Sequence, residues 1–162
     1  ILDKKGKLIK KAFQISTWAI PDEITSSIRK KNSDYTVFSL FKISVDPVKF
    51  SYFYQVSYDV PYLFSSDGTI VEKMKKTKIK QAKQIEIDKK NIPLTIMNIL
   101  DSLYSDYSMT NIYLLEFTES KDGEKKEKLF KLNCLVTEVY DFQGKIVDIP
   151  KEPLTLKNPD VK

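Results

Sequence analysis

An internal repeat constrains this chain more than any other feature of its sequence. Ile20-Pro21-x-x-Ile24 recurs 72 residues later as Ile92-Pro93-x-x-Ile96. Ser33-Asp34-Tyr35 recurs at the same offset as Ser105-Asp106-Tyr107. Self-similarity at a fixed spacing indicates that one structural unit occurs twice. The sequence therefore predicts two similar copies, which constrains the architecture but leaves the function open.

The repeat continues beyond the two Ile-Pro segments into the expected strands. The alternating apolar residues at 41, 43 and 45 return 72 residues later at 113, 115 and 117. The offset then becomes 76, so that the alternating apolar residues in 54–60 correspond to those in 130–136. An insertion in the polar stretch 119–126 accounts for the change, because hairpin loops tolerate insertions. The alternative is a chance similarity of simple alternating patterns, but the identical Ile-Pro and Ser-Asp-Tyr steps favour duplication.

The sequence predicts an α+β fold of two tandem repeats. Each repeat is expected to be a helix followed by an antiparallel meander sheet, with the helices packed on one sheet face. Pro21 suits the first turn of a helix over 21–32, and period-two alternation over 48–60 indicates a half-buried strand that Pro61 ends or kinks. The expected segments are an N-terminal strand segment 1–19, repeat 1 at 20–80, a connector 81–91, repeat 2 at 92–149 and an extended tail 150–162.

Composition and charge narrow the class of partner. The chain has 162 residues, of which 41% are hydrophobic and 30% charged, a balance typical of globular proteins. Its net charge of +5 comes almost entirely from lysine, and Arg29 is the only arginine. Nucleic-acid sites rely on arginine for bidentate contacts, so the sequence disfavours nucleic-acid binding. The lysine-rich stretch 73–90 is expected to form a solvated face or sheet edge.

The residues of common catalytic and metal sites are scarce. The chain has no histidine and one cysteine, Cys134, which excludes histidine-based triads and thiolate zinc clusters. Cys134 lies on the apolar side of an expected strand and is interpreted as a small buried hydrophobe. Asp34 and Asp106 are the acidic residues that recur in register. They form either a paired acid or cation site or, as we favour, the ends of two helix–strand loops. We therefore expect no catalytic residues, no metal and no cofactor.

The arrangement of helix, meander and glycine turn resembles the PepSY-like domains and the related beta-lactamase-inhibitor-protein-like tandem domains of bacterial envelopes. The residues that carry the resemblance are Ile20-Pro21, Ile92-Pro93, Asp34-Tyr35, Asp106-Tyr107 and the turns 64–71 and 140–147. It covers roughly residues 20–149, and the loss of alternation near Glu138 and the long connection 72–91 depart from it. The resemblance implies a secreted or periplasmic protein without a cofactor that binds through a sheet face, in some relatives to inhibit an enzyme. Because the chain opens without methionine, we also expect a signal peptide to have been removed.

We expect a protein partner, with the chain peripheral to a membrane at most. An exposed apolar stripe on the open sheet face is the predicted contact surface, formed by Phe38, Leu40, Phe53, Leu114 and Leu135. The alternative is that these residues pack against the N-terminal segment or the other copy. A second hypothesis is an assembly subunit of a cell-envelope complex that pairs through its N-terminal or edge strands. An enzyme that uses carboxylates and tyrosines is the third and least supported.

Overall fold

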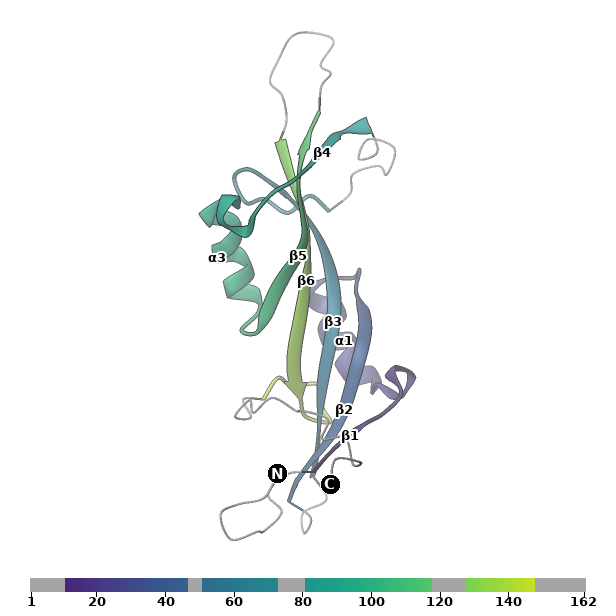
Figure 1. Ribbon diagram of the computed structural model, residues 1–162. Helices are drawn as coiled ribbons and strands as arrows, with labels where there is room; N and C mark the ends of the chain where they lie inside the picture. Colours follow the sequence, from purple (N-terminus) through teal and green to yellow (C-terminus); the bar gives the residue numbers. More distant parts are fainter. Residues whose placement is uncertain (1–10, 47–50, 73–80, 118–127, 148–162) are drawn as a thin grey trace, which may run out of the picture. The chain divides into compact units, whose positions relative to one another are not determined.

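The computed structural model describes residues 11–46, 51–72, 81–117 and 128–147 (Figure 1). These residues form an α+β fold with a six-stranded antiparallel sheet of order β1-β2-β3-β6-β5-β4, which confirms the α+β class and the antiparallel sheet of the prediction. The strands are β1 (Lys11–Gln14), β2 (Thr36–Asp46), β3 (Ser51–Ser65), β4 (Lys83–Glu86), β5 (Tyr107–Glu116) and β6 (Lys128–Tyr140). The helices are α1 (Asp22–Lys31), α3 (Leu94–Leu103) and the 3-10 turns η1 (Thr17–Ala19) and η2 (Lys89–Asn91).

Both α-helices begin directly after a proline. The carbonyl of Pro21 accepts hydrogen bonds from the backbone N–H groups of Ile24 and Thr25, at 3.0 and 3.2 Å. The carbonyl of Pro93 does the same for α3. In α1, acidic residues occupy the first turn and Arg29–Lys31 the last, so the side-chain charges complement the helix dipole at both ends. The helix predicted at 21–32 is therefore confirmed.

Strand β3 is longer than its sequence pattern predicts. Of the two outcomes expected at Pro61, an end or a kink of the strand, the end is wrong, because the strand continues through this exposed proline to Ser65. Proline lacks the N–H that a ladder hydrogen bond needs, so a strand tolerates it only where no neighbouring carbonyl requires that donor.

The chain divides into two compact units, each of which draws on both copies of the repeat. Unit 1 comprises Ile1–Ser27, Ser39–Val56 and Glu138–Lys162, and unit 2 comprises Ile28–Phe38 and Ser57–Thr137. Unit 1 combines the first part of α1 with the closing glycine turn of the second copy, and unit 2 combines the end of α1 and all of α3 with the closing glycine turn of the first copy. The compact units are therefore composed differently from the segments expected from the repeat.

In unit 1 the closing turn lies against the first turns of α1. Gly144 adopts φ 79°, and a bridge between Tyr140 and Ile146 closes the turn. Ser27 Oγ donates a hydrogen bond of 2.6 Å to the carbonyl of Gly144. A Cβ atom on Gly144 would lie 2.8 Å from the carbonyl carbon of Glu23, so only glycine fits between turn and helix. Ile24, Leu40, Ile43, Val56 and Tyr140 are among the fully buried residues of this unit.

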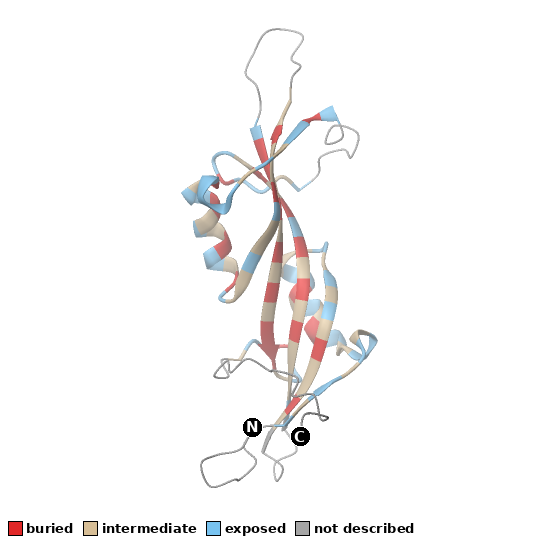
Figure 2. Cartoon of the chain, viewed as in Figure 1, coloured by how far each residue is buried: buried red, intermediate tan, exposed pale blue. Residues whose placement is uncertain are grey.

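In unit 2 the equivalent turn lies against α3. Gly68 adopts φ 89°, and a bridge between Phe64 and Ile70 closes this turn. A Cβ atom on Gly68 would lie 3.1 Å from Cδ1 of Ile99, an apolar and movable neighbour. The buried residues of this unit alternate along β3 and β6 (Figure 2) and include Tyr58, Phe64, Ile96, Leu100 and Leu132. A smaller buried cluster contains Ala82, Leu115 and Leu129.

The two glycine turns predict different costs for the same substitution. Both Gly68→Ala and Gly144→Ala place a Cβ on a residue with positive φ, which costs about 1–2 kcal/mol. Gly144→Ala also forces Cβ against the backbone of Glu23, which cannot turn aside as the Ile99 side chain can. We expect Gly144→Ala to lower the free energy of unfolding by on the order of 1–3 kcal/mol more than Gly68→Ala. Urea denaturation of the two variants measures the difference, and equal losses would contradict the close approach at Gly144.

Candidate functional site

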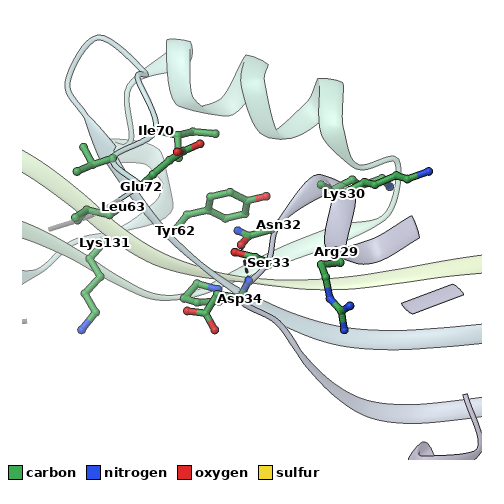
Figure 3. Close-up of a pocket in the computed structure, with 13 residues that line it drawn as sticks. Arg29, Lys30, Asn32, Ser33, Asp34, Tyr62, Leu63, Ile70, Glu72 and Lys131 are labelled. Atoms are coloured by element: carbon green, nitrogen blue, oxygen red, sulfur yellow. Dashed lines mark hydrogen bonds between the residues drawn. The ribbon is translucent and has the colours of Figure 1, made fainter. Parts of the chain in front are cut away.

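A cavity of about 640 Å³ opens in unit 2 (Figure 3). It is formed by the C-terminal turn of α1, the loop into β2, the later part of β3 and the closing turn after it. Its lining residues are Arg29, Lys30, Lys31, Asn32, Ser33, Asp34, Pro61, Tyr62, Leu63, Ile70, Val71, Glu72 and Lys131. The size falls within the range of sites for small molecules.

The rim of the cavity carries an excess of positive charge. Arg29, Lys30, Lys31 and Lys131 line it, whereas Asp34 and Glu72 are its carboxylates. Lys31 Nζ lies 5.3 Å from the centroid of the Tyr104 ring, which is a cation–π contact. This lysine is therefore already engaged with the protein. The first three cations also occupy the last turn of α1, where they stabilise the helix whether or not a ligand binds.

Tyrosine residues make the floor of the cavity rigid. Tyr62 lies at its centre in Figure 3, and its hydroxyl forms a buried hydrogen bond of 2.6 Å with the hydroxyl of Tyr104. The Tyr62 ring stacks on the ring of Phe64 at a centroid distance of 5.3 Å. A buried hydrogen bond and a stacked ring together fix the position of Tyr62, so the floor needs no rearrangement before a ligand enters.

A second candidate surface lies in unit 1, across three strands. Phe13 on β1 stands directly opposite Lys42 on β2. Lys42 Nζ lies 4.0 Å from the centroid of the Tyr52 ring on β3, and Lys11 Nζ lies 4.6 Å from the centroid of the Phe13 ring. Both rings are exposed. We call these four residues, Lys11, Phe13, Lys42 and Tyr52, the aromatic–lysine row.

Trp18 is the most exposed large apolar side chain among the described residues of unit 1. It sits in η1 with 94% of its surface exposed. The Ser16 hydroxyl accepts a hydrogen bond of 3.4 Å from the Trp18 backbone N–H, which holds the turn that presents the indole. A fully exposed tryptophan loses the stabilisation that burying its ring would give, so it is a candidate contact residue.

The structure separates the five residues of the predicted apolar stripe. Leu40 is fully buried, so its assignment to an exposed surface is wrong. Phe38 is 54% exposed, and Phe53, Leu114 and Leu135 are half-buried. At the offset of 76 that relates the two copies here, Phe53 corresponds to Leu129. Leu129 is fully buried in the cluster with Ala82 and Leu115.

A β-bulge explains why a stripe based on strict alternation fails. The register between β5 and β6 shifts between Thr110 and Tyr113, and Asn111 in that gap has φ 51°. Leu114 stands opposite Phe130, whereas Leu135 stands opposite Ser108. Because 130 and 135 are an odd number of residues apart on β6, Leu114 and Leu135 face opposite sides of the sheet.

Burial on both sides of strand β2 explains the position of Leu40. Leu40 and Ile43 are both fully buried, although they are three residues apart. The pairing of β1 with β2 is regular along this stretch, and the Ile15 N–H donates to the Leu40 carbonyl at 3.0 Å. Regular alternation places Leu40 and Ile43 on opposite faces, so both faces of β2 are covered here and parity alone could not show that Leu40 is buried.

Asp34 and Asp106 each lie between a helix and the strand that follows it. Asp34 lines the cavity, and its backbone N–H donates to Oδ1 of Asn32 at 2.9 Å. The Asp106 carbonyl accepts from the backbone N–H of Thr137 at 3.1 Å. Both residues thus take part in the loops that follow the helices. In the part of the chain that the structure describes, no group of three or more acidic, cysteine or histidine side chains could hold a metal.

Comparisons with protein-family models, with curated proteins and with solved structures found no match for this chain. The resemblance to PepSY-like domains therefore stays a prediction. None of the helices among the described residues is long and apolar enough to cross a bilayer.

Cys134 provides a test of the core of unit 2. Its side chain is fully buried, and burial, with a smaller contribution from the charge of Asp59, raises the pKa of its thiol to about 12. Only the thiolate reacts with disulfide reagents, so we expect labelling of the folded protein on the order of 100-fold or more slower than in denaturant. Reaction with dithionitrobenzoate in buffer and in guanidinium measures both rates. Rapid labelling in buffer would show that this part of the sheet opens readily.

Proposed function

We propose that this protein is a non-enzymatic protein-binding module and that the aromatic–lysine row, together with Trp18, is its contact surface. The observation that carries the proposal is Trp18, whose side chain is 94% exposed in a capped turn. Aromatic residues are enriched in the centres of protein interfaces, and tryptophan is the commonest energetic anchor. The proposed surface replaces the stripe that the sequence predicted.

The chemistry of the row favours a partner surface that presents carboxylates beside apolar side chains. Lys11 and Lys42 hold their ammonium groups over the exposed rings of Phe13 and Tyr52. A carboxylate of the partner pairs with these ammonium groups, while an apolar side chain covers the ring edges and the Trp18 indole. Such complementarity gives specificity and a fast association rate more than it gives affinity.

The type of function follows from the chemistry present in the chain. A chain without histidine, with Cys134 buried as a neutral thiol, lacks the histidine- and cysteine-based routes to nucleophilic and general-base catalysis. Binding, including inhibition of an enzyme, needs only a surface. The proposed location is the periplasm or the outside of the cell, as the resemblance to envelope domains implies.

We also propose that the fold is a duplication of one unit, a helix followed by an antiparallel meander. The pairing of Lys11 with Ser44 between β1 and β2 corresponds, 72 residues on, to the pairing of Lys83 with Glu116 between β4 and β5. The turns at Gly68 and Gly144 have the same bridge and the same positive φ. These equivalences support one ancestral pattern repeated in tandem.

An assembly subunit that pairs through its edges is the alternative function. The outer strands of the sheet are β1 and β4. Each spans four residues and includes a lysine. Short edge strands that carry lysine discourage pairing with another chain. The exposed aromatic surface therefore supports side-chain recognition better than it supports strand addition.

Photo-crosslinking tests the proposed surface against an equally apolar control position. Benzoylphenylalanine replaces Trp18 in one variant and Leu94 in another, because Leu94 is also highly exposed, at 73%, but lies in unit 2. In extracts of the source organism, we expect one discrete adduct from position 18 and none at that mass from position 94.

The charge of the row supplies the second part of this test. Lys42→Glu in the position-18 background should weaken the adduct about tenfold or more, because a carboxylate then faces the partner's carboxylates. Circular dichroism confirms that each variant is folded. The same adduct from both positions, or an adduct insensitive to Lys42→Glu, would contradict the assignment.

A further inference from the structure

We infer that the cavity of unit 2 is a binding site for a small carboxylate with an apolar body, a ligand of the medium-chain fatty-acid type. This activity is independent of the protein-binding surface in unit 1. The inference rests on three features of the cavity: an exposed apolar wall, a cationic rim with the chain's single arginine, and a floor fixed before binding.

The apolar wall comes from the closing turn of the first copy. Ile70 is 39% exposed, and Leu63 and Val71 line the cavity beside it. The wall is held in place because Ile70 bridges to Phe64 and the Val71 backbone N–H donates to the Leu63 carbonyl at 2.8 Å. An aliphatic chain against these residues removes apolar surface from water at about 25 cal/mol per Å².

The cationic rim suits a single carboxylate. Arg29 and Lys131 lie on opposite sides of Tyr62 in Figure 3. Among the residues that the structure describes, no carboxylate forms an ion pair with Arg29, Lys30 or Lys131, so these cations are available to a ligand. The planar guanidinium of arginine matches a carboxylate through two parallel hydrogen bonds, which a lysine cannot provide.

Two carboxylates in the lining limit the charge of the ligand. Asp34 and Glu72 lie in the same cavity as the cations. A phosphate, with its higher charge and no apolar body, meets their repulsion and leaves Ile70 uncovered. A neutral alcohol of the same length covers Ile70 but leaves the cations unmatched. The combination of an anionic head and an apolar tail is therefore what this cavity selects.

A titration followed by two-dimensional amide NMR tests the assignment with sodium octanoate as the probe. We expect saturable shifts at amides 29–34, 62–63 and 70–72, which border the cavity. Inorganic phosphate at matched ionic strength and octanol should each bind about tenfold more weakly, a difference of about 1.4 kcal/mol. Equal binding of phosphate and octanoate, or shifts scattered over the whole surface, would overturn the inference.

Charge-neutral variants separate the cavity from general attraction to lysine. Arg29→Gln with Lys131→Gln should lower octanoate affinity about tenfold, because both sides of the rim lose their cation. Lys89→Gln with Lys90→Gln removes the same charge from exposed residues of η2 outside the cavity lining and should leave affinity unchanged. Thermal unfolding checks that both double variants are folded. The inference fails if the two double variants bind octanoate alike.

Discussion

The contact between Ser27 and Gly144 is the interaction on which unit 1 depends. A hydrogen bond of 2.6 Å joins residues 117 positions apart, so the start of α1 and the end of the second copy are fixed together. Glycine is required there because the backbone of Glu23 occupies the space of a side chain. Because the contact closes a long loop, forming it costs more chain entropy than forming a local contact. In unit 2 the nearest atoms to a Cβ on Gly68 would be side-chain carbons, Cδ1 of Ile99 and Cβ of Thr95. The two glycine turns therefore pack on their helices through different contacts, a hydrogen bond and backbone atoms at Gly144 and side-chain carbons at Gly68.

The bulge in β5 has a comparable influence on the surfaces. One residue with positive φ, Asn111, moves every later side chain of the strand to the other face. Leu115 thereby joins Leu129 in the small cluster of unit 2, and Leu114 pairs with Phe130 instead. A surface predicted from parity alone is consequently divided between the two faces. Among the described residues, exposed rings such as Phe13 and Tyr52 lie on other strands, β1 and β3.

The local elements could be predicted because their causes are local. Pro21 and Pro93 start helices, and Gly68 and Gly144 make turns, through constraints on the residues' own backbones. Leu40 could not be placed, because its burial depends on tertiary packing that covers both faces of β2, which alternation alone does not reveal. Asn111 was the available signal for the bulge in β5, since asparagine tolerates positive φ better than most residues. The aromatic–lysine row was missed because its members come from three strands whose register the sequence does not specify. The cavity was missed for a similar reason: Arg29 and Ile70 meet only after β3 extends past Pro61.

The net charge of the chain says little about either candidate surface. Among the residues that the structure describes, acidic side chains outnumber basic ones, so the excess of lysine lies in segments such as 73–80. Charges farther away than about 8–10 Å are screened at physiological ionic strength. What a ligand or partner meets is the local arrangement: ammonium groups stacked on rings in unit 1, and a cationic rim above an apolar wall in unit 2. Both arrangements place positive charge directly beside exposed apolar surface. Such a combination suits an anion that carries an apolar part, which is the class of ligand that we propose for the cavity.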